Sequence, residues 1–149
     1  MAKKEAPQHR SNCPLNIALE IFGDRWTLLI LRDLMLKQFT TYKEFQESGE
    51  GIATNVLADR LKMLRQQGII VGERSASDAR IVCYRPTTKG LDLLPVMVEM
   101  IIWADQYEDT AAPARIMRRL KDDRNGFIGE IRSRFSEIEK GEGYRKTQD

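Results

Sequence analysis

Apolar residues recur at helical spacing in the middle of the chain, just before two short β-branched runs. Leu57, Leu61 and Leu64 lie four and three residues apart, so they share one face of a helix predicted over about 54–67. Gly68 then supplies a residue that tolerates the left-handed conformation in which many helices end. The opposite face of this helix is polar and carries Asn55, Asp59, Lys62 and Gln66.

Two short runs with strand preference follow this helix. Residues 69–71 are β-branched, and residues 81–84 return after a polar segment, 73–80, whose small and polar residues suit a hairpin tip. A helix followed by a two-stranded hairpin with a basic tip is typical of the winged helix-turn-helix. We therefore predict a mainly α fold with a small β-hairpin wing and additional C-terminal helices.

The segments before the central helix predict its helical neighbours. Pro14 suits the first position of a helix over about 14–23, which makes Cys13 its N-cap. The next helix, over about 24–37, is apolar on most sides and should form the buried centre, with Asp24 as its N-cap. A short third helix is expected over about 39–48, with Thr40 or Thr41 as its N-cap, because Glu44 follows Thr41 at the spacing of a capping box.

The segments after the hairpin are also helical by pattern. A long helix should run over about 87–107, with a kink or break at Pro95 because proline cannot continue the hydrogen-bond ladder. Two further helices are predicted over 115–121 and 127–138.

This pattern divides the chain into three parts. Residues 1–12 form a flexible polar arm, residues 13–107 a winged-helix DNA-binding domain that includes dimerisation helices, and residues 108–149 a C-terminal helical extension with a frayed tail.

Composition narrows the function classes. The formal net charge is only +2, so a basic footprint for nucleic acid must come from clustering rather than from total charge. No apolar run approaches the roughly 18 residues of a membrane helix, and two distant cysteines suit a reducing cytoplasm. A single histidine, no Gly-rich phosphate loop and no metal-ligand spacing argue against an enzyme, a cofactor or a metal site.

Many positions keep the order and the residue types of one known family. These positions are 13–14, 23–27, 29–34, Gly51, Ile52, Leu57, Arg60, Leu61, Leu64, Gly68, Tyr84, 87–90, Leu94, Pro95 and Trp103. In them the chain resembles the HxlR family of bacterial transcription regulators, over roughly residues 12–104. The hairpin tip at 78–80 is also similar to that of the related MarR family. Ala53 and Asn55 depart from the HxlR pattern, because the family usually has Ser at the first position and often Lys at the second.

The resemblance implies a transcription regulator, a repressor or an activator, that binds double-stranded DNA as a homodimer. An alternative is a winged-helix protein-interaction module without DNA contact. Arg60 lies nearer the apolar flank and could brace the fold, while Arg74 and Arg80 could be ordinary hairpin charges. The candidate DNA-binding residues are Thr54, Asn55, Arg60, Lys62, Arg74 and Arg80.

Homodimerisation is expected through the terminal helices. Residues 14–23 and 88–107 carry more apolar side chains than a small three-helix core can cover, and exposed apolar patches of that size mark interfaces. The candidate interface residues are Leu15, Leu19, Leu94, Val98, Ile102 and Trp103.

Cys13 is a candidate redox or electrophile sensor, as some relatives in the resembling family use the matching cysteine. A thiol at a helix N-terminus, with Arg10 close in sequence, favours the reactive thiolate. The alternative is an inert cap residue. Cys83, on a predicted strand, is expected to be packed and unreactive. The sequence predicts no particular small-molecule effector.

Overall fold

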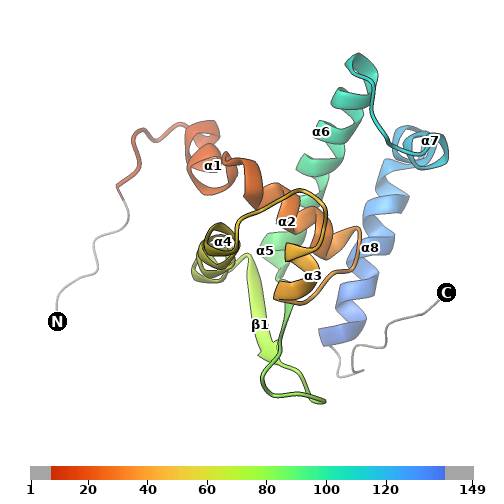
Figure 1. The fold of residues 1–149 in the computed structure, drawn as a ribbon. Coiled ribbons are helices and arrows are strands. Elements are labelled where there is room, and N and C mark those ends of the chain that lie inside the picture. The colour runs from red at the N-terminus through yellow and green to blue at the C-terminus, as the bar shows by residue number, and fades with distance from the viewer. Residues whose placement is uncertain (1–7, 140–149) are drawn as a thin grey trace.

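The computed structural model describes residues 8–139, with side chains through residue 136, and the predicted winged helix-turn-helix is confirmed (Figure 1). The elements in chain order are α1 (Pro14–Phe22), α2 (Arg25–Met35), α3 (Tyr42–Gln46), α4 (Thr54–Gln66), β1 (Ile70–Arg74), β2 (Val82–Pro86), α5 (Thr88–Leu91), α6 (Leu94–Tyr107), α7 (Ala114–Asp122) and α8 (Arg124–Glu139).

The wing, residues 70–86, is a two-stranded antiparallel hairpin that begins directly after α4. Gly68 adopts φ +68°, and the N–H of Ile69 donates to the carbonyl of Leu64 at 2.9 Å, which ends α4 and reverses the chain. Both strands extend beyond their predicted ends, to Arg74 and to Pro86. The reason is backbone pairing: Ile70 faces Pro86 and Arg74 faces Val82, so polar residues join the ladder.

The core centres on α2, as the sequence predicted. Asp24 caps this helix by accepting from the N–H groups of Trp26 and Thr27 at 2.9 and 3.1 Å. Farther along, Leu31, Leu34 and Met35 are at most 1% exposed. α3 is shorter than predicted, but its N-cap Thr41 and Glu44 form the capping box expected from their spacing.

The helix after the wing is broken near Pro95, as expected. α5 ends at Leu91, and Pro95 lies in the first turn of α6, where its missing N–H costs no hydrogen bond. Gly90 allows α5 to pack on the turn between α4 and β1, because a Cβ there would lie 2.2 Å from the carbonyl oxygen of Ile69. The break therefore lets α6 leave the winged helix at its own angle (Figure 1).

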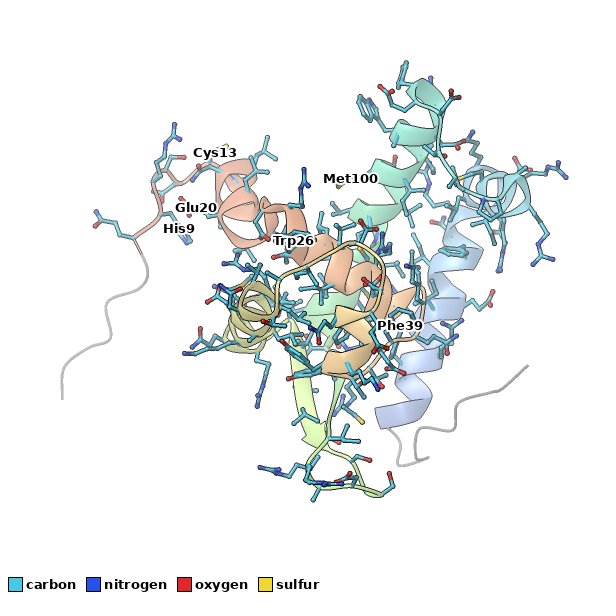
Figure 2. The ribbon with its side chains drawn as sticks, in the orientation of Figure 1. His9, Cys13, Glu20, Trp26, Phe39 and Met100 are labelled. Carbon is cyan, nitrogen blue, oxygen red and sulfur yellow. The ribbon has the colours of Figure 1, made fainter. Side chains whose placement is uncertain are left out.

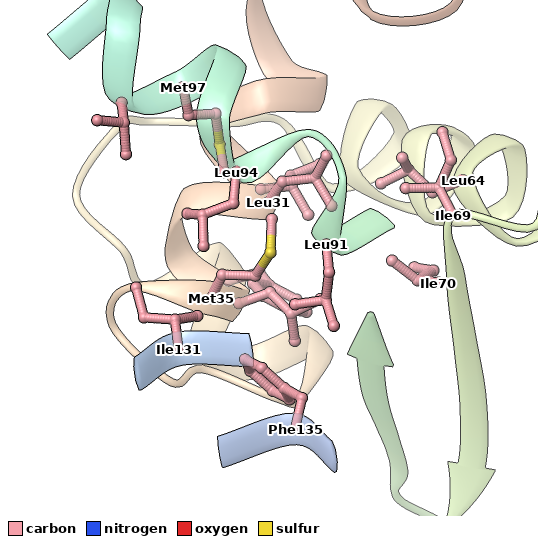
Figure 3. Close-up of a cluster of buried hydrophobic side chains, with 14 of the residues drawn as sticks. Leu31, Met35, Leu64, Ile69, Ile70, Leu91, Leu94, Met97, Ile131 and Phe135 are labelled. Atoms are coloured by element: carbon pink, nitrogen blue, oxygen red, sulfur yellow. The ribbon is translucent and has the colours of Figure 1, made fainter. Parts of the chain in front are cut away.

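The C-terminal extension forms an α7–α8 hairpin that belongs to the core. Only Asp123 separates the two helices, a shorter gap than predicted, because its carboxylate accepts from the N–H of Gly126 at 3.1 Å. Figure 3 shows Ile131 and Phe135 of α8 beside Met35 of α2. The predicted frayed tail, 141–149, and most of the predicted arm lie outside the described residues.

Candidate nucleic-acid interface

The polar face of α4 is open. Thr54, Asn55 and Lys62 are exposed, while the leucines on the opposite face are at most 2% exposed. The N-cap is Ala53, whose methyl group makes no capping hydrogen bond, so the first turn of α4 has no side-chain cap. A helix presented in this way offers both polar side chains and backbone N–H groups to a ligand.

Two contacts fix the start of α4. The hydroxyl of Tyr42, on α3, donates to the carbonyl of Thr54 at 2.9 Å. In the preceding turn, Glu50 accepts from Arg32 of α2 at 2.8 Å, and this hydrogen bond lowers the pKa of Glu50. Arg32 is held in turn by the buried carboxylate of Asp33 at 2.7 Å. The helix that presents the polar face is thus tied to the central helix.

Arg60 is paired with two carboxylates of the protein. Its guanidinium contacts Asp59 at 2.7 Å and reaches the Asp24 carboxylate, the N-cap of α2, at 3.5 Å. The geometry favours the bracing role weighed for this residue in the sequence. Burial raises the pKa of Asp24, but hydrogen bonds from Thr27 and from the N–H of Trp26 outweigh it, so the pKa is below its usual value.

The two wing arginines differ in what they contact. Arg80 is 90% exposed and projects from the tip, while its N–H, Nε and Nη2 donate to the Asp78 carboxylate at 3.0, 3.0 and 2.8 Å. These hydrogen bonds, the side-chain ones foremost, lower the pKa of Asp78. Arg74 instead donates to the carbonyl of Ala79 at 2.6 Å and braces the tip from within.

A cleft opens between α4 and the base of the wing. Its volume is about 470 Å³, and we call it the α4–wing cleft. Sequence reasoning missed Arg65 here, although Arg65 follows Lys62 by three residues, a spacing that places both on one side of the helix. Tyr84 was noted only as a position that matches the resembling family, and no sequence signal pointed to Tyr42. The lining residues are Tyr42, Ala58, Leu61, Lys62, Arg65, Gln66 and Tyr84.

Two of the six candidate interface residues are corrected by the structure. Leu94 and Val98 are 0% exposed and form part of the core, because the α6 face that carries them packs inward. Ile102 is half-buried. Leu15, Leu19 and Trp103 are exposed at 68%, 54% and 63%.

The exposed apolar face of α6 includes Trp103, as expected, but its other residues were not predicted. Its stripe, at spacings of four, three and four residues, consists of Val96, Met100, Trp103 and Tyr107. Met100 projects away from α7 and α8 (Figure 2). A mostly apolar groove of about 380 Å³ also lies beneath α1, lined by Pro14, Ile17, Ala18, Ile21, Phe22, Ile69, Lys89 and Leu93.

Cys13 is the N-cap residue of α1, as predicted, and is exposed without a side-chain capping bond. The arm before it is held against α1 by Glu20, which contacts Nδ1 of His9 at 2.5 Å and accepts from the N–H of Arg10 at 2.9 Å (Figure 2). The backbone hydrogen bond from Arg10 is the main cause that lowers the pKa of Glu20. Cys83 is half-buried in β2.

Two negative observations hold for the described part of the chain. Within residues 8–139, no group of three or more histidine, cysteine or acidic residues could hold a metal ion. No helix of that part is long and apolar enough to span a bilayer.

Known proteins resemble this chain over the winged helix. A family model described as HxlR-like helix-turn-helix matches residues 21–112. The HTH-type transcriptional regulator YodB of Bacillus subtilis is 38% identical over 98 residues, which are 64% of this chain and 85% of YodB. Rv3095 of Mycobacterium tuberculosis is an uncharacterized HTH-type transcriptional regulator. It is 37% identical over 92 residues, which are 60% of this chain and 56% of Rv3095.

Solved structures agree in fold over the same region. PA1607 superposes with a TM-score of 0.62 at 34% identity, covering 70% of this chain and 72% of that one. Reduced YodB superposes with a TM-score of 0.54 at 35% identity, covering 65% and 95%. YodB is also known in a quinone-bound form, with a TM-score of 0.51 at 37% identity, covering 64% and 99%. The chain spans about half the length of the mycobacterial relative.

Proposed function

We propose, since the chain belongs to the HxlR-like helix-turn-helix family of transcription regulators, that it is a cytoplasmic, sequence-specific DNA-binding regulator that acts as a homodimer. The observation that carries this proposal is the exposed polar face of α4 beside a wing whose tip projects Arg80. An α-helix of this kind fits the major groove, and an arginine on the wing fits the electronegative minor groove.

In this arrangement α4 supplies the base contacts. Asn55 can pair bidentately with adenine, which is worth about 1–3 kcal/mol of discrimination. Thr54 and Lys62 lie on the same open face, near bases or phosphates. Arg80 contacts the backbone or minor groove beside them. Arg60 and Arg74 act through the protein, because their guanidinium groups hold α4 and the wing tip in place.

The homodimer follows from the uncovered apolar surface. Leu15 and Leu19 on α1 and the exposed stripe of α6 would face a second copy, whose symmetric contact removes them from water. Two copies of α4 would then meet half-sites about one helical turn of DNA apart, or a multiple of it.

The DNA-binding proposal is tested by capturing genomic fragments with the protein and sequencing them. Variants are then titrated on the enriched site and on versions with single base changes. Asn55→Ala should alter preference at one position, whereas Arg80→Ala should weaken binding to every version. Wild-type binding by both variants would contradict this assignment. Failure to enrich any fragment would favour the interaction module without DNA contact, which the regulator relatives do not favour.

A response to electrophiles through Cys13 is a second part of the proposal. Its support is the exposed thiol at the N-terminus of α1, a helix that also carries the apolar residues assigned to the dimer. A group added at Cys13 would alter how two copies meet and thereby the spacing of their α4 helices.

A further inference from the structure

The α4–wing cleft presents cations that the described part of the protein does not neutralise. Its walls carry the Lys62 ammonium and the Arg65 guanidinium, and its lining includes no carboxylate among the residues the structure describes. Within residues 8–136, neither cation has an ion-pair or hydrogen-bond partner. The nearby Arg60, by contrast, is matched with two carboxylates. The positive charge that no carboxylate neutralises in this region therefore lies in the cleft.

The Tyr84 side chain is built into the base of this cleft. Its ring lies 6.2 Å from the ring of Phe45 and over Gly72, its partner in the ladder, where a Cβ would come within 3.1 Å of the Tyr84 Cε1. Its N–H is held by the carbonyl of Thr40 at 2.7 Å. The hydroxyl of Tyr84 has no partner within residues 8–136. A fixed ring thus carries an unused hydrogen-bond donor beside two unneutralised cations.

The opposite wall is equally constrained. Tyr42 uses its hydroxyl on the carbonyl of Thr54, so its ring fixes the distance between α3 and the first turn of α4. The amide of Gln66 completes the rim. Two cations, a hydroxyl and an amide around an open groove match the chemistry of a singly charged phosphodiester with its sugar.

We propose that the α4–wing cleft is a binding site for the DNA backbone, in which Arg65 and Lys62 hold a phosphodiester and the hydroxyl of Tyr84 donates to it. This inference rests on the proposed function, because it names the part of the DNA that enters the cleft. A strand held there runs between the helix in the major groove and the wing. The cleft then fixes the register in which α4 meets the bases, without reading them.

The test measures affinity for a labelled mixed-sequence duplex of about 20 base pairs across a series of salt concentrations. Each phosphate contact contributes about 0.9 to the slope of log affinity against log salt. Arg65→Ala and Lys62→Ala should each lower the slope by about that amount, while Arg65→Lys keeps it. Tyr84→Phe removes a neutral donor, so it should weaken binding several-fold to about tenfold at an unchanged slope.

The matched control is Arg118→Ala, which removes an exposed cation on α7, away from α4 and the wing (Figure 1). It should keep the wild-type slope. Thermal unfolding of every variant confirms that the fold is kept. If the wild type binds the duplex but Arg65→Ala and Lys62→Ala both keep its slope, the cleft assignment is wrong and the proposed function stands. If the wild type binds no duplex, both the proposed function and the cleft assignment are wrong.

Discussion

The Asp78 carboxylate holds the Arg80 guanidinium at the tip of the wing, with Nε and Nη2 donating to its two oxygens at 3.0 and 2.8 Å. If the tip meets DNA as proposed, this acidic side chain by itself repels the phosphates. Its hydrogen bonds to Arg80 give it a compensating role, because they restrict a long side chain that is otherwise 90% exposed.

Asp78→Ala therefore should weaken DNA binding even though it makes the wing more positive. We expect a loss of about three- to tenfold, since one rotamer-rich side chain must then be ordered on binding. Anisotropy titration on the captured genomic site measures it. Ser77→Ala, at the same tip, is the control and should bind like the wild type. A gain in affinity for Asp78→Ala would show that charge, not orientation, dominates at the tip.

Asp24→Ala should destabilise the fold by about 0.5–2 kcal/mol at neutral pH, because it removes the N-cap of α2. The folded pKa of Asp24 lies below its ordinary value of 3.8, so its contribution is complete above that value and is lost as pH falls through the lower folded value. Urea unfolding of both proteins at pH 7 and at about pH 2.5 tests this. An equal difference at the two pH values would contradict the cap assignment.

Trp103→Asp should convert the homodimer to a monomer and leave the monomer folded, because the side chain is 63% exposed on the α6 stripe. Sedimentation equilibrium at micromolar concentrations measures the state. Ile116→Asp, a partly exposed apolar residue of α7, is the matched control and should remain dimeric. A wild type that is itself monomeric at high micromolar concentration would remove the dimer proposal.

Phe135→Ala should destabilise the whole chain by about 3–5 kcal/mol, because this ring of α8 is 5% exposed within the shared core. Urea unfolding followed by tryptophan fluorescence reports it, since Trp26 packs against the same cluster. The control is Ser136→Ala, at the next and exposed position, which should leave the free energy of unfolding unchanged. A wild-type midpoint for Phe135→Ala would mean that the extension is an independent appendage.

Treatment with a quinone should change DNA affinity of the wild type and leave Cys13→Ser unresponsive. The Cys13 thiolate adds to a C=C carbon of the quinone ring, so that the C–S bond forms as the C=C π bond breaks. Water protonates one quinone oxygen, and the proton on the attacked ring carbon moves to the other, which gives the hydroquinone adduct. Mass spectrometry verifies the adduct, and anisotropy measures binding. Cys83→Ser should respond like the wild type. Unchanged affinity with Cys13 fully modified would leave it as a cap residue.

Local signals allowed most of the fold to be predicted from the sequence. Some residues act on the backbone within one turn of their own positions, so their effects can be predicted from the sequence without tertiary information. Examples are Asp24, Pro95 and Gly68. The α6 interface residues were harder, because α6 is apolar on two faces. Which face remains open depends on α8, whose packing partners the sequence did not reveal.

The residues of the candidate site are also of two kinds: those that a local pattern predicts and those whose role depends on tertiary contacts. Asn55 and Lys62 follow from the helical period of α4 alone. The roles of Arg60 and Arg74 needed the positions of Asp24 and of the Ala79 carbonyl. Tyr84 joined the cleft only through the strand register, which places its ring over the Cβ-free Gly72. Contacts between distant segments are set by the fold, and no local pattern encodes them.

The docking of α8 on α2 has a consequence for how the protein is made. During synthesis, α2 and the wing leave the ribosome before Ile131 and Phe135 do. Until those side chains arrive, Met35 and its neighbours present an uncovered apolar surface in the nascent chain. The winged helix can therefore complete this part of its packing only after α8 is translated, and exposed apolar surface of this kind makes a nascent chain prone to aggregation.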